Sequence, residues 1–83
     1  MEGMKPETQL DSISKRSIIK LVGIRIRSIR MKKGLTQADL AARVGTSQAK
    51  ISHYELGTKQ PEIVTLDRVA AGLGVEISEL LKE

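Results

Sequence analysis

Residues 34–57 read GLTQADLAARVGTSQAKISHYELG, a pattern typical of two short helices joined by a tight turn. Each predicted helix opens at a hydroxyl residue, Thr36 or Ser47, whose side chain can accept a hydrogen bond from the first helical turn. Each also closes at a glycine, Gly45 or Gly57, because glycine readily adopts the left-handed conformation found at helix ends. The outer face of the second predicted helix carries small and amide side chains that have no role in a core.

The composition of the 83 residues limits the classes of protein that the chain can represent. This length has room for one small domain with a single core, and the absence of Phe and Trp makes that core aliphatic. The absence of Cys excludes a disulfide framework and a thiolate metal site. No apolar run approaches the ~20 residues that cross a membrane, and the N-terminus lacks the apolar stretch of a secretory signal. We therefore expect a soluble, cytoplasmic protein.

The positive charge is concentrated on the predicted helix pair and the segment before it. The net charge of the chain is +4, but residues 20–60 alone carry nine basic and two acidic side chains. Residues 1–19 are neutral overall, and residues 61–83 have a net charge of −3. A cationic field of this kind is expected where phosphates must be neutralised. Together with the outer face of the second helix, it favours an α-helix set into the major groove of DNA, although solubilising lysines and arginines remain the alternative.

The rest of the chain predicts three more helices and an N-terminal arm. Residues 1–14 are polar, contain Pro6 and lack periodicity, so we expect a disordered arm. A first helix is expected from about Lys15 to Lys33, weakened in its middle by Gly23. A fourth helix, capped near Glu62 or Thr65, ends before Gly74, and a last short one covers residues 75–81. Residues 15–83 thus predict one all-α domain of five helices.

A longer pattern of glycines, apolar residues and a few polar residues runs from about Gly23 to Leu80. It comprises Ile26, Ile29-Arg30, Gly34-Leu-Thr-Gln37, Leu40-Ala41, Gly45-Thr-Ser47, Ile51-Ser52, Glu55, Gly57, Pro61, Leu66, Val69-Ala70, Leu73-Gly74-Val75 and Leu80. This pattern resembles the phage-repressor and Cro-like helix-turn-helix domains of the Xre family. The resemblance implies a compact, lambda-repressor-like fold and a sequence-specific regulator of transcription that binds double-stranded DNA. The recognition helix, about residues 47–56, would lie in the major groove.

The resemblance also implies which side chains read DNA bases. Gln48 occupies the leading base-reading position, and a glutamine amide can donate to N7 and accept from the N6 amino group of adenine. Ala49 and the Cβ side of Ser47 offer apolar contact to a thymine methyl group. His53 lies one turn after Ala49, where it either contacts DNA or stays an idle surface residue. As a lone histidine without further ligands at metal spacing, it predicts neither a zinc site nor a catalytic base.

A second set of residues is expected at the DNA backbone. Gln37 resembles the family glutamine that holds a phosphate and braces the recognition helix, beside the free N–H groups of a helix N-terminus; a solvated glutamine is the alternative. The resemblance pairs Arg30 with Glu55, which ties the recognition helix to the first helix. The predicted phosphate contacts are Arg30, Gln37, Lys50, Ser52, Lys59 and Gln60.

The expected partner is a (pseudo)palindromic operator bound by a homodimer, because one recognition helix reads only a few base pairs. The predicted dimer contacts are Ile77, Leu80 and Leu81, although these three residues could equally cover the core of the monomer. No catalytic constellation, cofactor motif or metal site is apparent, so we expect no enzyme. A dimeric repressor or autoregulator associated with the nucleoid is the main prediction. An antitoxin with a protein partner, or a transcription adaptor on the same fold, is the alternative.

Overall fold

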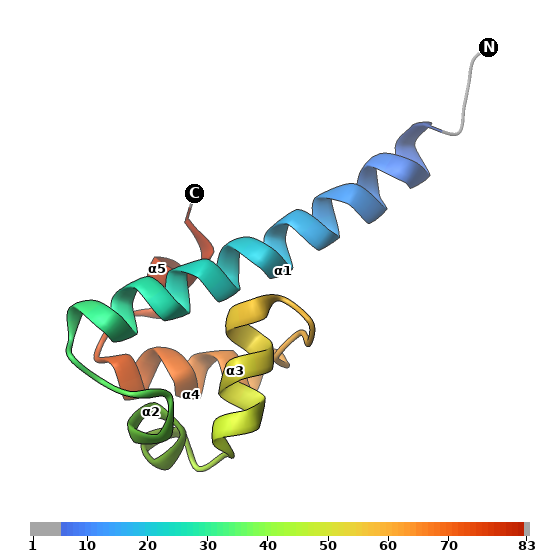
Figure 1. Cartoon of the computed structure of the whole chain (residues 1–83). Coiled ribbons are helices and arrows are strands. Elements are labelled where there is room, and N and C mark those ends of the chain that lie inside the picture. The colour runs from blue at the N-terminus through green and yellow to red at the C-terminus, as the bar shows by residue number, and fades with distance from the viewer. Residues whose placement is uncertain (1–5, 83) are drawn as a thin grey trace.

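The chain folds into five α-helices, seen in a computed structural model that describes residues 6–82, with side chains from Ser17 onward (Figure 1). The helices are α1 (Pro6–Lys32), α2 (Gln37–Val44), α3 (Gln48–Leu56), α4 (Ile63–Leu73) and α5 (Ile77–Leu81). Residues 6–82 contain no β-strand. The all-α, five-helix architecture predicted from the sequence is therefore confirmed.

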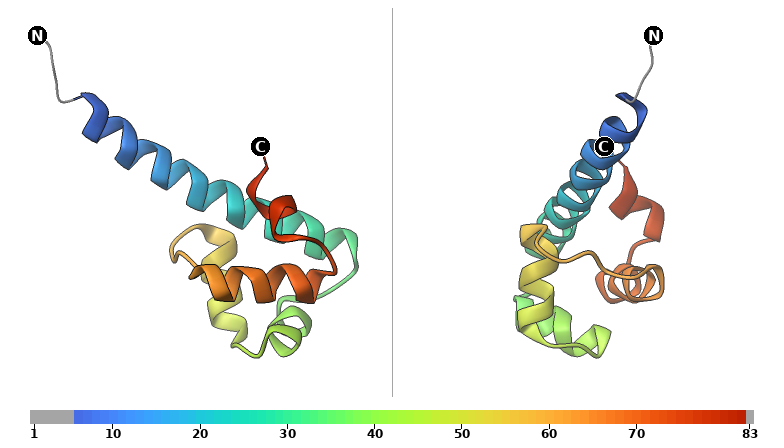
Figure 2. Two further views of the ribbon diagram at one scale, coloured as in Figure 1. Left: turned by 180° about the vertical axis from the view of Figure 1, so that it is seen from behind. Right: turned by 90° about the vertical axis from the view of Figure 1, so that its right-hand side faces the viewer.

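The helices form two layers that meet at α1. Figure 2 shows α2 and α3 on one side of the domain and α4 and α5 on the other, with α1 running across the top of both. Helix α1 packs on α3 and α5, and α2 packs on α3 and α4. Helix α3 is therefore held against α1, and helix α2 against α4.

Helix α1 begins at Pro6, well before the expected start near Lys15. Proline suits the first position of a helix, because the N–H that it lacks has no partner there. No glycine or further proline interrupts the sequence from Glu7 to Val22. Residues 6–14 of the expected disordered arm are therefore the first turns of α1, and residues 1–5 lie outside the described residues. The helix is about 40 Å long and projects past the rest of the domain (Figure 1).

The core is aliphatic apart from one tyrosine, as the composition predicts. Its members are largely or wholly shielded from solvent and come from all five helices: Val22, Ile26, Leu40, Ala41, Val44, Ile51, Tyr54, Leu66, Val69, Ala70, Leu73 and Leu80. Ile18, which has the right spacing for the core, is 54% exposed, because α1 meets the rest of the domain mainly from Val22 onward.

The predicted helix ends are confirmed where local hydrogen bonds define them. The Asp39 N–H donates to the Thr36 hydroxyl over 2.9 Å, and the Thr36 N–H donates to the Asp39 carboxylate over 2.9 Å, which completes a capping box. Gly45 and Gly57 both have positive φ angles. Helices α4 and α5 begin after Glu62 and Glu76 without a side-chain cap. No helix within residues 6–82 combines the length and apolar character that spanning a membrane requires.

Gly23 permits a close crossing of α1 over the end of α3. A Cβ atom at this position would lie 2.7 Å from the Glu55 carbonyl oxygen and would also collide with the Tyr54 carbonyl oxygen. Both obstacles are backbone atoms, so neither can move without shifting α3. The sequence predicts only that Gly23 weakens α1, whereas the structure shows what its missing side chain makes room for.

We expect Gly23→Ala to destabilise the domain by about 1–3 kcal/mol, because overpacking against backbone outweighs the better helix propensity of alanine. Urea unfolding followed by circular dichroism measures this loss. Ser17→Ala is the control, because Ser17 is an exposed α1 residue and the substitution improves helix propensity in open space. A Gly23→Ala domain as stable as the Ser17→Ala domain would contradict the close crossing.

Candidate nucleic-acid interface

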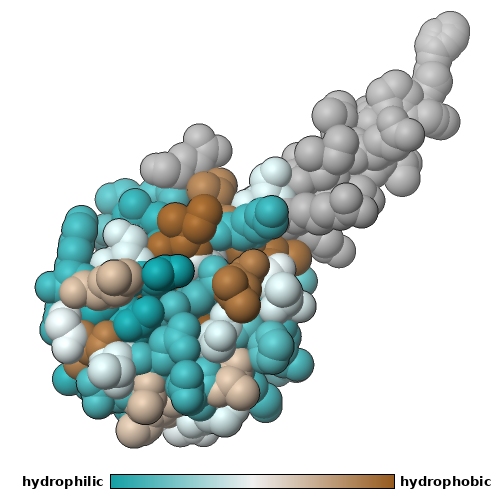
Figure 3. Space-filling view, in the orientation of Figure 1, coloured by the Kyte–Doolittle hydropathy of each residue, from teal (hydrophilic) through white to brown (hydrophobic). Residues whose placement is uncertain are grey.

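Helix α3 has one face in the core and one face in solvent. Ile51 and Tyr54 point inward, and the Glu55 side chain is also buried. Gln48, Ala49 and His53 are exposed on the outer face, as the helical spacing predicts. Figure 3, which views this side of the domain, shows a surface that is mostly hydrophilic, with a few separate hydrophobic patches. The outer face of α3 is therefore free for an external ligand.

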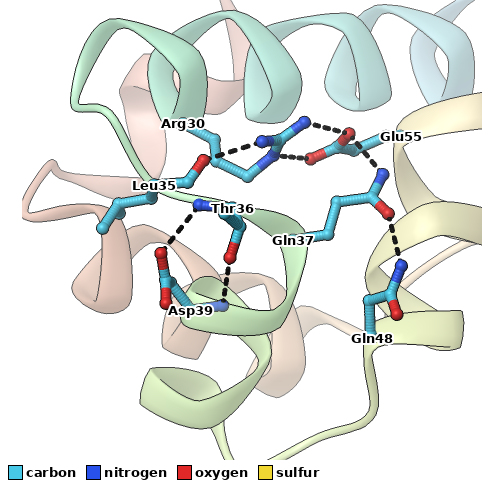
Figure 4. Close-up of polar contacts among 7 residues, drawn as sticks. All are labelled: Arg30, Leu35, Thr36, Gln37, Asp39, Gln48 and Glu55. Atoms are coloured by element: carbon cyan, nitrogen blue, oxygen red, sulfur yellow. Dashed lines mark hydrogen bonds and ion pairs between the residues drawn. The ribbon is translucent and has the colours of Figure 1, made fainter.

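A buried ion pair joins α3 to α1. Arg30 donates from Nε to one Glu55 carboxylate oxygen over 2.6 Å and from Nη2 to the other over 3.0 Å (Figure 4). Its Nη1 donates to the Leu35 carbonyl oxygen over 2.8 Å. The hydrogen bond to Glu55 raises the pKa of Arg30 above its usual value, although partial burial opposes the shift. Such a bidentate pair fixes the orientation of the guanidinium and the carboxylate as well as the distance between them.

The same carboxylate continues the hydrogen bonds toward the outer face of α3. Gln37 at the start of α2 donates from Nε2 to Glu55 over 3.0 Å, and Gln48 donates from Nε2 to the Gln37 side-chain oxygen over 3.0 Å (Figure 4). A connected series of side chains therefore runs from Arg30 to the first residue of α3. The family resemblance predicts the Arg30–Glu55 pair and the contact of Gln37 with the recognition helix. The structure adds which groups of that helix Gln37 bonds to, the Glu55 carboxylate and the Gln48 amide.

An open recess lies beside this series, at the N-terminus of α2. Its lining includes Arg30, Gly34, Thr36, Gln37 and Gln48. The first N–H groups of a helix lack partners within the helix and carry partial positive charge. A recess with an arginine on one wall and a helix N-terminus on another suits an anionic group such as a phosphate.

The other predicted DNA-contacting residues lie on α3, at its cap or in the loop that follows it. Lys50, Lys59 and Gln60 are exposed, and Ser52 is half-buried. His53 Nδ1 lies 3.0 Å from the Thr58 hydroxyl, so this ring nitrogen has a partner within the domain. The Ser47 hydroxyl accepts the Lys50 N–H over 3.2 Å and acts as the cap of α3.

Leu56 is a residue on this side that sequence reasoning missed. It is 62% exposed, and its position in α3, seven residues after Ala49, places it on the same face of the helix. The helical spacing could have indicated it, but a leucine is expected to enter the core.

The predicted dimer contacts differ in exposure. Leu80 is fully buried and packs in the monomer core, so the prediction that it forms a dimer contact is wrong and the alternative, a core residue, holds. Ile77 is partly buried against the same core. Leu81 is 51% exposed, and it is the one of the three whose side chain is largely open to solvent. The short α5 turns its buried residue toward α1 and α4, which helical periodicity alone could not decide.

Among the side chains that the structure describes, those of residues 17–82, no three from His, Asp or Glu come together in a group that could hold a metal ion. The polar groups exposed along α3 and in the loop after it are amides, hydroxyls, lysine ammonium groups and the His53 ring. Such groups recognise nucleic acids by hydrogen bonding and charge.

The chain is similar to known DNA-binding regulators. Residues 26–80 match the helix-turn-helix family. The chain is 44% identical to an uncharacterized HTH-type transcriptional regulator, y4dJ, of Sinorhizobium fredii, over 75% of this chain and 80% of that protein. It is 36% identical to the immunity repressor protein of Bacillus phage phi105, over 75% of this chain but only 43% of the repressor.

Two solved structures share the fold. The restriction-modification controller protein C.AhdI from Aeromonas hydrophila is 29% identical, with a TM-score of 0.75 over 78% of this chain and 94% of that chain. The P22 c2 repressor, solved in complex with a synthetic operator, is 34% identical, with a TM-score of 0.69 over 74% of this chain and 92% of that chain.

Because Arg30 and Glu55 bond to each other, we expect the effects of substituting them on the free energy of unfolding to be strongly coupled. Arg30→Met leaves the buried Glu55 charge without its main partner, so we expect a loss of about 2–3 kcal/mol in the free energy of unfolding. Glu55→Gln is expected to cost less after Arg30→Met than on its own. A double-mutant cycle by urea unfolding measures the coupling, and additive effects of the two substitutions would disprove it.

The capping box predicts a pH effect at the start of α2. Hydrogen bonds from the Thr36 backbone and side chain hold the pKa of Asp39 below its usual value of about 3.9. Because the folded state has the lower pKa, the box stabilises α2 above pH ~4, and this contribution is lost as the pH falls through the lowered pKa. We expect Thr36→Val to move the pKa of Asp39 back toward its usual value in a carboxyl NMR titration. An unchanged pKa would show that the Thr36 side chain has no part in it.

Proposed function

This chain belongs to the helix-turn-helix family of DNA-binding transcriptional regulators, and from that membership we propose that it acts as a dimeric repressor or autoregulator. Helix α3 would read the major groove of a (pseudo)palindromic operator. The observation that carries this proposal is the side-chain series from Arg30 through Glu55 and Gln37 to Gln48. As a DNA-bound protein, it would lie on the nucleoid in the cytoplasm.

Gln48 is the main base-reading residue in this proposal. Its Nε2 donates one hydrogen bond to Gln37, which leaves the second N–H and the side-chain oxygen for a base. An amide in this state can donate to adenine N7 and accept from the adenine N6 amino group. Because Gln37 already holds the amide, little rotamer entropy is lost when DNA binds. Ala49 and the Cβ of Ser47 would contact thymine methyl groups, and His53 would reach the groove edge.

The phosphate contacts divide into a central and an outer set. Gln37 would hold a phosphate in the recess at the N-terminus of α2, where Arg30 adds positive charge while it remains bonded to Glu55. Lys50 and Ser52 on α3, and Lys59 and Gln60 in the loop after it, would contact the flanking backbone. These contacts would set the position of α3 without specifying the sequence.

A homodimer follows from the requirement for specificity. One recognition helix contacts too few base pairs to select an operator in a genome, whereas two helices about 34 Å apart read two half-sites. The chain spans less than half of the phage phi105 repressor that it matches.

Selection from a random DNA library should yield a (pseudo)palindromic site. The binding of protein variants to that site then distinguishes residues that read bases from residues that contact phosphates. We expect Gln48→Ala to lose ~1–3 kcal/mol of binding free energy and to relax specificity at one base position in each half-site. Lys59→Ala should weaken binding to all sequences alike and reduce the salt dependence by about one counterion. Fluorescence anisotropy on matched and substituted duplexes measures both effects.

The control for folding is the thermal unfolding of each variant. Recovery of no enriched site would contradict the proposal and would favour the antitoxin or the adaptor. A Gln48→Ala variant with unchanged base preference would remove Gln48 from the reading role.

A further inference from the structure

We propose that Thr58 holds the imidazole ring of His53 in the tautomer that presents a bare nitrogen to DNA, so that His53 reads the amino group of a cytosine or an adenine. The inference rests on the proposed function and deepens it, because it names the class of base that His53 reads. Thr58 is a positioning residue in this arrangement, since it acts through the His53 ring and contacts no base itself.

The backbone after α3 brings Thr58 back against the last turn of the helix. Gly57 has a φ angle of 74°, the left-handed conformation that reverses the chain at a helix end. The Thr58 N–H donates to the His53 carbonyl oxygen over 3.0 Å. This hydrogen bond places the Thr58 side chain beside a residue that lies five positions earlier in the chain. The contact between the two side chains therefore follows from the turn at Gly57.

The Thr58 hydroxyl has two polar neighbours, and both belong to His53. Its oxygen lies 3.0 Å from the ring nitrogen Nδ1 and 3.2 Å from the His53 carbonyl oxygen. A carbonyl oxygen can only accept, and a hydroxyl has a single hydrogen to donate. When that hydrogen goes to the carbonyl oxygen, Nδ1 must carry the ring hydrogen and donate it to the hydroxyl oxygen. Both short contacts are then hydrogen bonds.

The other tautomer of His53 satisfies only one of these contacts. With the ring hydrogen on Nε2, the bare Nδ1 would accept the hydroxyl hydrogen. The hydroxyl oxygen would then face the carbonyl oxygen with no hydrogen between them. Because the partner of one ring nitrogen decides which nitrogen is protonated, the hydroxyl selects the ring with its hydrogen on Nδ1.

In the selected tautomer, Nε2 is a hydrogen-bond acceptor that faces away from Thr58. His53 is exposed on the outer face of α3, and no side chain of residues 17–82 forms a hydrogen bond with its Nε2. In the major groove, the donors are the N4 amino group of cytosine and the N6 amino group of adenine, whereas guanine and thymine present acceptors. A neutral His53 therefore matches cytosine or adenine and is mismatched with guanine or thymine.

The same count of hydrogens separates Thr58 from the phosphate contacts. Its one hydroxyl hydrogen is donated to the His53 carbonyl oxygen over 3.2 Å, so none is left for a phosphate oxygen, which can only accept. Lys59 and Gln60, the next residues in the loop, are exposed and carry donors suited to the DNA backbone. The loop thus combines one residue that orients a base reader with two that can bind phosphate.

The first test is the tautomer of His53 in the untagged full chain without DNA, at about pH 8, where histidine side chains are usually uncharged. The ¹⁵N chemical shifts of the two ring nitrogens distinguish a protonated nitrogen from a bare one, and His53 is the only histidine in the sequence. We expect the hydrogen on Nδ1 in the wild type and in Thr58→Ser, which keeps the hydroxyl. Thr58→Val should move the ring toward the tautomer with its hydrogen on Nε2. The matched control is Thr65→Val, the same change within α4.

The second test is base preference on the selected operator, measured by fluorescence anisotropy at the same pH. At the base position that His53→Ala no longer discriminates, we expect the wild type to prefer cytosine or adenine. An analogue of that base without its exocyclic amino group should weaken wild-type binding by about three- to tenfold and leave His53→Ala binding unchanged. Thr58→Val should lose most of the preference, whereas Thr58→Ser and Thr65→Val should keep it. Thermal unfolding verifies that each variant folds.

The outcomes distinguish this inference from the proposed function. A wild-type ring with its hydrogen on Nε2, or a Thr58→Val ring with the wild-type tautomer, would overturn the role of Thr58. An operator at which His53 confers no preference, or a preference for guanine or thymine, contradicts the base assignment and leaves the proposed function standing. If no operator is selected, the proposed function and the base assignment both fail, while the NMR result still decides the role of Thr58.

Discussion

The buried carboxylate of Glu55 is the group on which the arrangement of the interface depends. A charge out of water is costly unless donors surround it, and here Arg30 and Gln37 supply three hydrogen bonds at 2.6–3.0 Å. Those donors come from α1 and α2, so satisfying one carboxylate on α3 fixes three helices relative to one another. The same bonds hold Gln37 where it can orient Gln48.

Close backbone packing supports this polar junction. Gly23 lets α1 approach the last turn of α3 at the residues Tyr54 and Glu55, so that Arg30, two turns further along α1, reaches the carboxylate. A bulkier residue at position 23 would separate the helices and lengthen the ion pair. Packing and charge pairing thus act together: the missing side chain brings the helices into contact, and the ion pair sets their rotation.

The domain keeps its two kinds of surface apart. Amides, hydroxyls and cations gather around α3 and the N-terminus of α2, whereas exposed aliphatic side chains, including Ile63 and Leu81, lie where α1, α4 and α5 meet. Charge and hydrogen-bond donors suit phosphate binding, whereas exposed apolar area favours contact with a protein. Separate surfaces allow each contact to form without weakening the other.

The sequence by itself determined the local features. Helix ends such as Thr36 and Gly57 follow from hydrogen bonds and φ angles within a few residues, and the family pattern indicated that Arg30 pairs with Glu55. Only the tertiary structure decided which apolar residues stay exposed. It buries Leu80, which the sequence offered as a dimer contact, and it leaves Ile18 exposed, although the helical spacing placed that residue in the core. Burial depends on how helices distant in sequence pack, and periodicity identifies the apolar face of a helix but not the neighbour that covers it.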